Sequence, residues 1–349
     1  MVRRSVLAMF AVMAIVFGVV VSTPAGAVVD SATIVPSPNA GTSNDRLLSV
    51  SCVSVTECVA VGYTVGSVHE TLAMVWDGSV WSIVSSPNAG TSNNELISVS
   101  CVSASDCVAV GYTQTGSAYG TLAMVWDGSV WSIVSSPNAG TINDWLYSVW
   151  CVSVTECVAV GSTDTGSATE TLAMVWDGTV WSIVSSPNAG TTFDRLNKVS
   201  CVSASDCVAV GRTDTGSATE TLVMVWDGTV WSIVSSPNAG TINDGLYSVS
   251  CVSVAECVAV GSTDTGSATE TLVMVWDGTV WSIVSSPNAG TTFDRLSSVS
   301  CVSDCVAVGR TDTGNSGYET LVLSLTGPVS PSTTTTTLSP DQVVPAFTG

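Results

Sequence analysis

Short apolar runs of strand length alternate with polar turn residues along nearly the whole chain, and their order repeats about every 50 residues. One copy has its apolar runs at Leu196–Val202, Cys207–Thr213, Thr221–Trp226 and Thr229–Ser235. The runs alternate with period two, are rich in β-branched and aromatic residues, and are too short for helices. Four such strands joined by short loops form an antiparallel meander, so the pattern predicts an all-β fold of four-stranded blades, a β-propeller.

An Asp-Gly dipeptide joins the third and fourth runs of a copy, as at Asp227 and Gly228. Asp-Gly between two apolar runs is among the strongest signals for a hairpin, because a type I′ turn needs positive φ at both central residues. We therefore expect a two-residue turn at this place in the repeat.

The two ends of the repeat region complement each other. Ser31–Gly41 matches the fourth run and its following loop without three runs before it, whereas the last copy, Leu296–Leu325, lacks a fourth run. We predict a six-bladed propeller over residues 28–327, closed by the N-terminal strand, because closure removes exposed sheet edges. The six first strands begin near Leu47, Leu96, Leu146, Leu196, Leu246 and Leu296.

Residues 1–27 have the features of a secretory signal. Arg3 and Arg4 precede the apolar stretch Val6–Val21, and Ala25–Ala27 supplies a small-residue cleavage site. An uncleaved membrane anchor is the alternative, although the apolar stretch is short for a span. We expect a secreted protein with no transmembrane span after signal removal.

Residues 328–349 form a Thr/Ser/Pro-rich segment. This composition cannot bury apolar surface, so it predicts an extended tail or stalk. The final VPAFTG is similar to the bacterial cell-wall sorting motif LPxTG, but it has one extra residue and no hydrophobic stretch or basic tail follows. Attachment to the cell wall or surface is therefore an option beside free secretion.

The formal net charge of the chain is −20. A strongly acidic protein repels nucleic acid and anionic membrane surfaces, which excludes both as partners on electrostatic grounds. We expect an extracellular protein or a glycan as the partner, and a monomer.

Twelve cysteines occur in six pairs, each at the end of a first run and the start of a second. A hairpin would place the two sulfurs of a pair opposite each other, and locally paired cysteines in a secreted chain predict disulfides. Zinc is the alternative, but His69 is the only histidine and C-x5-C is not a zinc spacing. The pairs are Cys52/Cys58, Cys101/Cys107, Cys151/Cys157, Cys201/Cys207, Cys251/Cys257 and Cys301/Cys305.

The loops between copies, and those between second and third runs, are the longer and more variable ones, and we expect them to share one face. Variable loops on a rigid scaffold commonly carry recognition, and aromatic side chains commonly anchor it. Because acids flank these aromatics, we expect a neutral or cationic partner, or one bridged by calcium. The candidate binding face consists of Trp145, Asp144, Phe193, Asp194, Phe293, Asp294, Asp164, Asp214 and Asp264.

Metal and catalytic sites find little support. No D-x-D-x-D-G loop is present, so no metal or cofactor is assigned, and calcium is left open at the acidic rings. A hydrolase needs an acid and a base, or an activated nucleophile, at one asymmetric site. Most polar positions recur in several copies and His69 is alone in its loop, so no catalytic residue is assigned. Arg46, Arg195 and Arg295 each follow an aspartate and are expected to make weak surface ion pairs.

Tryptophans flank the Asp-Gly turn in pairs, such as Trp226 and Trp231. Sugar stacking is one interpretation, but a tryptophan at the same place in successive copies more often packs one copy against the next. Trp145 and Trp150 break the pattern, because they occur in the third copy alone. Trp145 precedes the first strand of that copy and is the better candidate for an exposed contact.

The motifs SVSC-x5-CVAVG and TL-x-MVWDG-x-VWSIVSSPN resemble those of secreted bacterial proteins with Cys-containing, β-propeller-like repeats, over roughly Ser31 to Leu325. TLAMVWDGSVWS is more weakly similar to the RCC1-type repeat and to the Asp-box of sialidases, although the leading serine of the Asp-box is absent. The resemblance implies a propeller fold and transfers no activity.

Two function classes remain from the sequence. The favoured one is a secreted or cell-surface, non-enzymatic binding module that recognises a protein or glycan through one propeller face. The alternative is a secreted propeller-type carbohydrate-active enzyme, a glycoside hydrolase or lyase.

Overall fold

A computed structural model describes residues 35–41, 44–140, 142–240, 242–302, 304–312 and 317–326, and these residues form strands and turns without a helix. The predicted signal segment and the predicted Thr/Ser/Pro-rich tail lie outside the described residues. No helix long and apolar enough to cross a membrane occurs within the described ranges.

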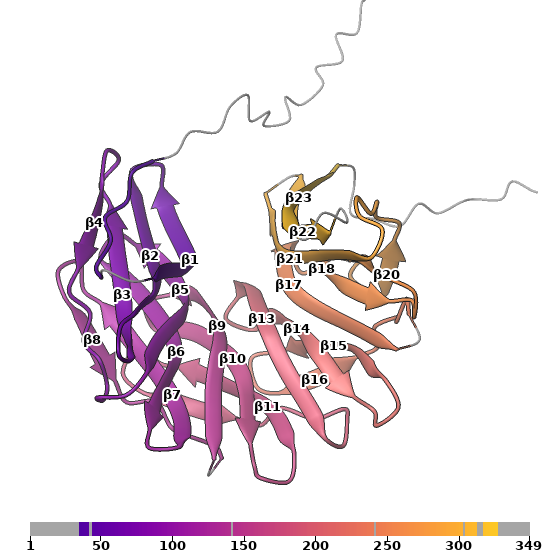
Figure 1. The fold of residues 1–349 in the computed structure, drawn as a ribbon. Coiled ribbons are helices and arrows are strands. Elements are labelled where there is room, and N and C mark those ends of the chain that lie inside the picture. The colour runs from indigo at the N-terminus through magenta and orange to yellow at the C-terminus, as the bar shows by residue number, and fades with distance from the viewer. Residues whose placement is uncertain are drawn as a thin grey trace, which may run out of the picture. The chain divides into compact units, whose positions relative to one another are not determined.

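In the described residues, five four-stranded groups and one three-stranded group follow one another (Figure 1). They are β1 (Asp45–Ser54), β2 (Glu57–Val65), β3 (His69–Trp76) and β4 (Trp81–Val84); β5 (Asn94–Ser103), β6 (Asp106–Thr115), β7 (Ala118–Trp126) and β8 (Trp131–Val134); β9 (Asn143–Ser153), β10 (Glu156–Asp164), β11 (Thr169–Trp176) and β12 (Trp181–Val184); β13 (Phe193–Ser203), β14 (Asp206–Asp214), β15 (Thr219–Trp226) and β16 (Trp231–Val234); β17 (Asn243–Ser253), β18 (Glu256–Asp264), β19 (Thr269–Trp276) and β20 (Trp281–Val284); β21 (Phe293–Cys301), β22 (Cys305–Asp312) and β23 (Tyr318–Leu325).

Each group is an antiparallel meander, as the period-two pattern predicts. In the fourth repeat, Cys201 pairs with Cys207, Cys207 with Trp226, and Trp226 with Trp231 across successive strands. A single parallel bridge, such as that between Thr219 of β15 and Asn243 of β17, links one repeat to the next. The repeated four-stranded antiparallel blade is therefore confirmed.

The predicted two-residue turn between the third and fourth strands is wrong. Because Trp226 pairs with Trp231, four residues form the loop. The Oδ1 atom of Asp227 accepts hydrogen bonds from the N–H groups of Thr229 and Val230, both at 2.8 Å, and from the Thr229 hydroxyl at 2.7 Å. Gly228 has φ of 90°, which a glycine adopts without strain. The aspartate thus closes the loop through its side chain, an Asx-type turn, and the fourth strand is shorter than predicted.

The core lies between successive repeats. Val158, Val160 and Ala173 of the third repeat pack against the fourth, where Leu196, Val199, Met224, Trp226 and Trp231 are buried. The rings of Trp226 and Trp231 are 5.5 Å apart between centroids. These tryptophans pack one repeat against the next, as the sequence suggests, and the same arrangement recurs along the chain.

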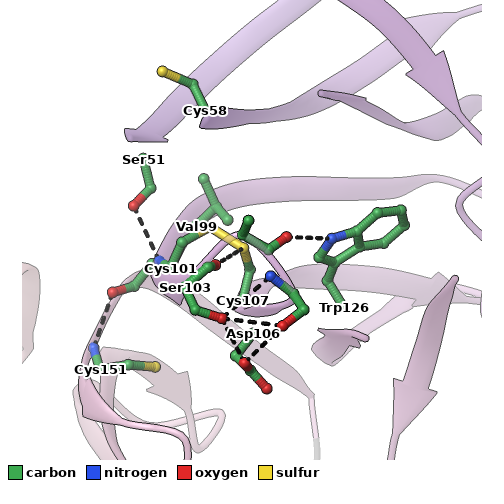
Figure 2. The surroundings of a disulfide bond; sticks show 12 residues. Ser51, Cys58, Val99, Cys101, Ser103, Asp106, Cys107, Trp126 and Cys151 are labelled. Carbon is green, nitrogen blue, oxygen red and sulfur yellow. Dashed lines mark hydrogen bonds between the residues drawn. A yellow bond between two sulfur atoms is a disulfide. The ribbon is translucent and has the colours of Figure 1, made fainter. Parts of the chain in front are cut away.

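First strands of successive repeats are also joined by serine hydroxyls. The Ser51 Oγ accepts a hydrogen bond from the Cys101 N–H at 3.0 Å, and the Ser100 Oγ accepts one from the Cys151 N–H at 3.0 Å (Figure 2). Trp150 takes the place of this serine in the third repeat. Lys198 likewise replaces a serine two positions earlier in the fourth repeat, and burial lowers the pKa of Lys198.

All six predicted cysteine pairs form disulfides within their own repeat, with Cα–Cα distances of 4.0 to 4.1 Å. Figure 2 shows the surroundings of the Cys101–Cys107 bond, where the Trp126 Nε1 donates to the Ala104 carbonyl at 3.1 Å. Six disulfides indicate an oxidising compartment.

The second cysteine of a pair belongs to the core and is not a site open to a ligand. Cys257 is paired with Cys251 as predicted, yet it is only 1% exposed. It packs within the same buried cluster as Leu246, Met274 and Trp281. Its predicted role as a disulfide partner is confirmed, and the start of the second strand faces the packing between repeats. Cys107, Cys157, Cys207 and Cys305 are buried in the same way.

The first and last repeats each leave apolar side chains uncovered. Leu47 and Val50 of β1 are 44% and 59% exposed, whereas Leu96 in the next repeat is fully buried. In the last repeat, Val308 and Val322 are 42% and 63% exposed. The predicted closing strand is not seen, because residues 35–41 contain no strand and residues 31–34 lie outside the described ranges.

Candidate functional site

The repeats differ most at the end where the first strand begins, the second ends and the third begins. There, directly opposed residues of the first and second strands change from repeat to repeat, while the positions further along these strands keep their valine, alanine and cysteine. We call these six opposed pairs the variable end. They are Arg46–Tyr63, Glu95–Tyr112, Trp145–Ser162, Arg195–Arg212, Gly245–Ser262 and Arg295–Arg310.

The aspartates that begin the first strands are buried. Asp144, Asp194 and Asp294 are each 2% exposed. The Asp194 Oδ1 accepts hydrogen bonds from the Ala189 and Gly190 N–H groups at 3.1 and 3.0 Å, and the other two repeat this arrangement. These carboxylates hold the loop between repeats and do not form a solvent-exposed ring of acids. Their membership of the binding face stays a prediction.

The second set of predicted acids lies in the loops between second and third strands. Asp164, Asp214 and Asp264 are half-buried, and each accepts a hydrogen bond through Oδ1 from the glycine N–H two positions on, at 2.7 to 2.8 Å. No group of three or more His, Cys, Asp or Glu side chains that could hold a metal ion occurs in the described part of the chain.

An aromatic and acidic cluster occupies the variable end of the first three repeats. The His69 Nδ1 lies 2.5 Å from the Glu95 Oε1, and the Tyr63 ring stacks on the imidazole with centroids 4.7 Å apart. Burial, together with a hydrogen bond to Glu95, raises the pKa of Tyr112 above its usual range. The loop position of His69 suggested an isolated side chain. In the structure His69 is not isolated, because the Glu95 carboxylate of the next repeat contacts it.

Trp145 lies at the edge of that cluster, half-buried, with its ring centroid 5.9 Å from that of Tyr119. Phe193 and Phe293 lie at the same end, at the starts of β13 and β21. The guanidinium carbon of Arg212 lies 5.2 Å from the centroid of the Phe193 ring. The Phe293 and Tyr318 rings pack edge-on, with their centroids 5.3 Å apart. The three predicted aromatics thus belong to one end of the repeats, each beside the variable side chains.

The arginines of the later repeats stack on aromatic rings. The Arg295 guanidinium carbon lies 3.8 Å from the centroid of the Tyr247 ring, and that of Arg195 lies 4.9 Å from the Tyr147 ring. The predicted ion pairs with the preceding aspartates are wrong: within the described ranges, no carboxylate oxygen lies within 4.0 Å of these arginines. The reason is that those aspartates turn inward to the loop N–H groups.

Arg212 faces Arg195 directly across β14 and β13. Desolvation and the nearby positive charges of Arg195 and Arg295 lower the pKa of Arg212. Like charges directly opposite each other on a sheet are destabilising. The facing arginines therefore repel each other, and aromatic stacking together with a hydrogen bond from the Arg195 Nε to the Asn197 Oδ1 at 2.8 Å offsets part of that repulsion.

A cavity of about 230 Å³ opens among these cations and is lined by Arg212, Gly245, Tyr247, Arg295 and Arg310. We call it the arginine pocket. Gly245 stands where other repeats carry Trp145, Arg195 and Arg295. A Cβ built on Gly245 would meet nothing nearer than the Tyr247 hydroxyl at 3.5 Å. The missing side chain leaves the space open.

Apolar clefts recur at the opposite end, between successive repeats. One of about 160 Å³ is lined by Trp150, Trp176, Trp226, Cys157 and Cys201, and equivalent residues line others. Because these clefts recur almost unchanged between successive repeats, they do not identify one place on the protein as a binding site.

Sequence reasoning missed Tyr112, Arg212, Tyr247 and Arg310, and it did not include Glu95 among the candidate site residues. The sequence contains a signal for the arginines. GRTD replaces GSTD in the fourth and sixth copies, and these two copies also carry FDR at the beginning of the first strand. The opposition of the two arginines in each copy follows from strand register. Their meeting across the intervening repeat could be seen only in the folded structure.

No protein-family model and no curated protein matches this chain. Among solved structures, the Hadza microbial sialidase Hz136 is 11% identical with a TM-score of 0.51, and the match covers 74% of this chain and 62% of that one, which is less than two thirds of its length. YCF48 bound to D1 peptide is 13% identical (TM-score 0.46; 82% and 88% covered), and the fucose-specific lectin from Aleuria aurantia is 12% identical (0.45; 82% and 96%). The likeness to the sialidase concerns the fold alone, a propeller-like series of four-stranded blades.

Proposed function

We propose that this protein is an extracellular, non-enzymatic binding module that recognises a protein or a glycan through its variable end. One observation carries the proposal: side-chain variation is concentrated at one end of a scaffold whose strands, disulfides and opposite end repeat almost unchanged. Recognition is commonly placed where a rigid scaffold presents varied side chains. The nine predicted residues of the binding face, Trp145 foremost, lie at this end.

The proposed architecture is a six-bladed propeller closed through the N-terminal segment. Between internal repeats, Val210 and Val223 of one repeat pack on Leu246 and Val249 of the next. The last repeat offers Val308 and Val322 at the positions of Val210 and Val223, and the first offers Leu47 and Val50 at those of Leu246 and Val249. These uncovered faces are the two halves of the same interface, so their pairing within one chain would bury both.

Secretion and surface attachment complete the proposal. The signal-like residues 1–27 and the Thr/Ser/Pro-rich residues 328–349 support export followed by display on a stalk. The six disulfides are consistent with that compartment. We assign no cofactor and propose a monomer.

The test is a screen of the mature protein against glycan and peptide arrays, with glycoside substrates assayed in parallel. We expect saturable binding without turnover, weakened in Trp145→Ala at the variable end and unchanged in Asp127→Asn at the opposite end. Turnover that disappears in Glu95→Gln would instead support the carbohydrate-active enzyme. Binding lost in Asp127→Asn alone would place the site at the opposite end and overturn the proposal.

A further inference from the structure

Positive charge is scarce in this protein, and much of it gathers in one place. The chain has 8 Lys and Arg residues against 28 Asp and Glu. Three of the arginines, Arg212, Arg295 and Arg310, nevertheless line the arginine pocket. A chain so rich in carboxylates has ample means of neutralising them, yet within the described ranges no carboxylate oxygen comes within 4.0 Å of these three.

Aromatic rings hold the three guanidinium groups. Arg295 lies over Tyr247 at 3.8 Å, Arg212 over Phe193 at 5.2 Å, and Arg310 over Tyr318 at 4.3 Å. Stacking engages the face of a guanidinium and leaves the N–H groups at its edge available for a planar acceptor. The rings therefore orient the cations without satisfying their donors.

Two of these donors are buried without an acceptor. The Nε atoms of Arg212 and Arg295 are inaccessible to solvent and make no hydrogen bond. An unsatisfied buried donor is unfavourable by about 1–3 kcal/mol, and more for a charged group. Both side chains line the arginine pocket, and within the described residues neither Nε–H group has an acceptor from the protein.

The acids that share the cavity are already engaged. Asp244 is 2% exposed, and its two carboxylate oxygens accept from the Gly240 N–H at 3.1 and 3.2 Å. Asp264 accepts from the Gly266 N–H at 2.8 Å and, through Oδ2, from the Asn243 amide at 3.5 Å. Both carboxylates accept hydrogen bonds that hold their own loops, while Arg212, Arg295 and Arg310 line the same cavity.

From this arrangement we propose that the arginine pocket binds an oxyanion, a carboxylate, sulfate or phosphate group, held between Arg212, Arg295 and Arg310. The pocket rests on the proposed function, since it forms part of the variable end, and it gives the ligand class of that surface as anionic rather than neutral or cationic. The net charge of −20 opposes polyanions, so the group is carried by a ligand with few charges. Arginine suits this task because two N–H donors of its fork can bind two oxygens of one carboxylate or phosphate group.

The experiment measures binding of sodium sulfate, sodium phosphate, glucuronate and a glutamate-containing dipeptide to the mature protein by calorimetry, with sodium chloride at matched ionic strength as the reference. We expect one site per chain for at least one of these anions, and glucuronate against the dipeptide distinguishes a sugar from a peptide source. Two variants are built from residues the fold already accepts: Gly245→Trp copies Trp145 and fills the cavity, and Arg310→Ser copies Ser162 and Ser262. Each should weaken binding by at least about tenfold.

The control is Lys198→Ser, which removes one positive charge outside the variable end and copies the serine that the other repeats carry at this position. It should bind like the parent. Three results would contradict the proposed anion site. They are anion binding by Gly245→Trp that equals that of the parent, a loss of binding in Lys198→Ser as large as in the pocket variants, and binding by the parent no stronger than that of chloride. If none of the anions binds but an array ligand does, and Trp145→Ala abolishes binding of that ligand, then the anion site is wrong and the proposed function stands. Anion binding by the parent, with no ligand bound on the glycan and peptide arrays, would support the anion site and contradict the proposed function.

Discussion

The Oδ1 atom of Asn88 accepts a hydrogen bond from the backbone N–H of Thr71 at 2.8 Å. This bond ties the segment that leaves one repeat to the third strand of that repeat, and it recurs at 2.8 Å in the next four. Thr320 holds the position of Thr71 in the last repeat and is exposed, while Asn39 holds the position of Asn88 in the N-terminal segment. The two are the unmatched halves of a bond that every other repeat makes.

We predict that Asn39→Ala destabilises the protein. If the N-terminal segment completes the last repeat, the Thr320 N–H loses its acceptor, at a cost of about 1 kcal/mol. Thermal melting of the parent and variant measures the effect. Asn138→Ala, which breaks the internal bond to Thr121, sets the scale, and the two variants should shift the melting temperature in the same direction. A melting temperature unchanged by Asn39→Ala, with Asn138→Ala lowered, would contradict closure by this segment.

A second prediction concerns the buried aspartates of the loops between repeats. Asp194→Ala should destabilise the protein by about 1–3 kcal/mol, because the Ala189 and Gly190 N–H groups lose their acceptor in a buried place. Asp194→Asn should be tolerated much better. The chain provides the precedent: Asn94 occupies this position in the second repeat and accepts from the Ala89 N–H at 3.0 Å. Equal losses for the two variants in chemical denaturation would show that charge, not hydrogen bonding, is what the loop needs.

We predict that part of the stability of the protein is lost in acid, because of the aspartates in the loops between third and fourth strands. Hydrogen bonds from the Thr229 hydroxyl and from the Val230 N–H lower the pKa of Asp227, and the equivalent bonds lower the pKa of the other four. A carboxyl whose pKa is lower in the folded state stabilises that state above the unfolded pKa, about 3.9, and loses the effect as pH falls through the folded value.

The melting temperature should therefore fall as pH drops from about 4 toward 2. A variant with asparagine at Asp77, Asp127, Asp177, Asp227 and Asp277 keeps the Oδ1 acceptor but cannot be protonated in this range. Its melting temperature should fall less steeply over the same interval, measured at constant ionic strength. Parallel pH profiles for the parent and the variant would assign the acid sensitivity to other carboxyls.

The disulfides should contribute to stability one repeat at a time. Replacing Cys201 and Cys207 together by serine opens a link between residues six positions apart, and the chain-entropy relation gives a loss of about 2 kcal/mol. Chemical denaturation checks the magnitude. Mass spectrometry of unreduced peptides checks the pairing, since a dominant link between two repeats would contradict the hairpin arrangement of the cysteines.

Much of the fold could be predicted because its signals are local. The period-two alternation of Leu196–Val202 and the six-residue spacing of Cys201 and Cys207 fix a strand, a hairpin and a disulfide within a dozen residues. The length of the Asp227 turn was misjudged because the dipeptide rule ignores the side-chain bonds that make a four-residue loop stable.

The sequence by itself determined the repeat, the strands within it, the disulfide pairs and the end of the repeat where the residues vary. Only the tertiary structure decided which carboxylates accept hydrogen bonds from loop N–H groups, as with Asp194. It also decided which cations have no carboxylate oxygen within 4.0 Å among the described residues, as with Arg212 and Arg310. The physical reason is distance along the chain. Strand order follows from neighbours in sequence, but the surroundings of Arg212 depend on Gly245 and Arg295, which reach it only when three successive repeats pack together.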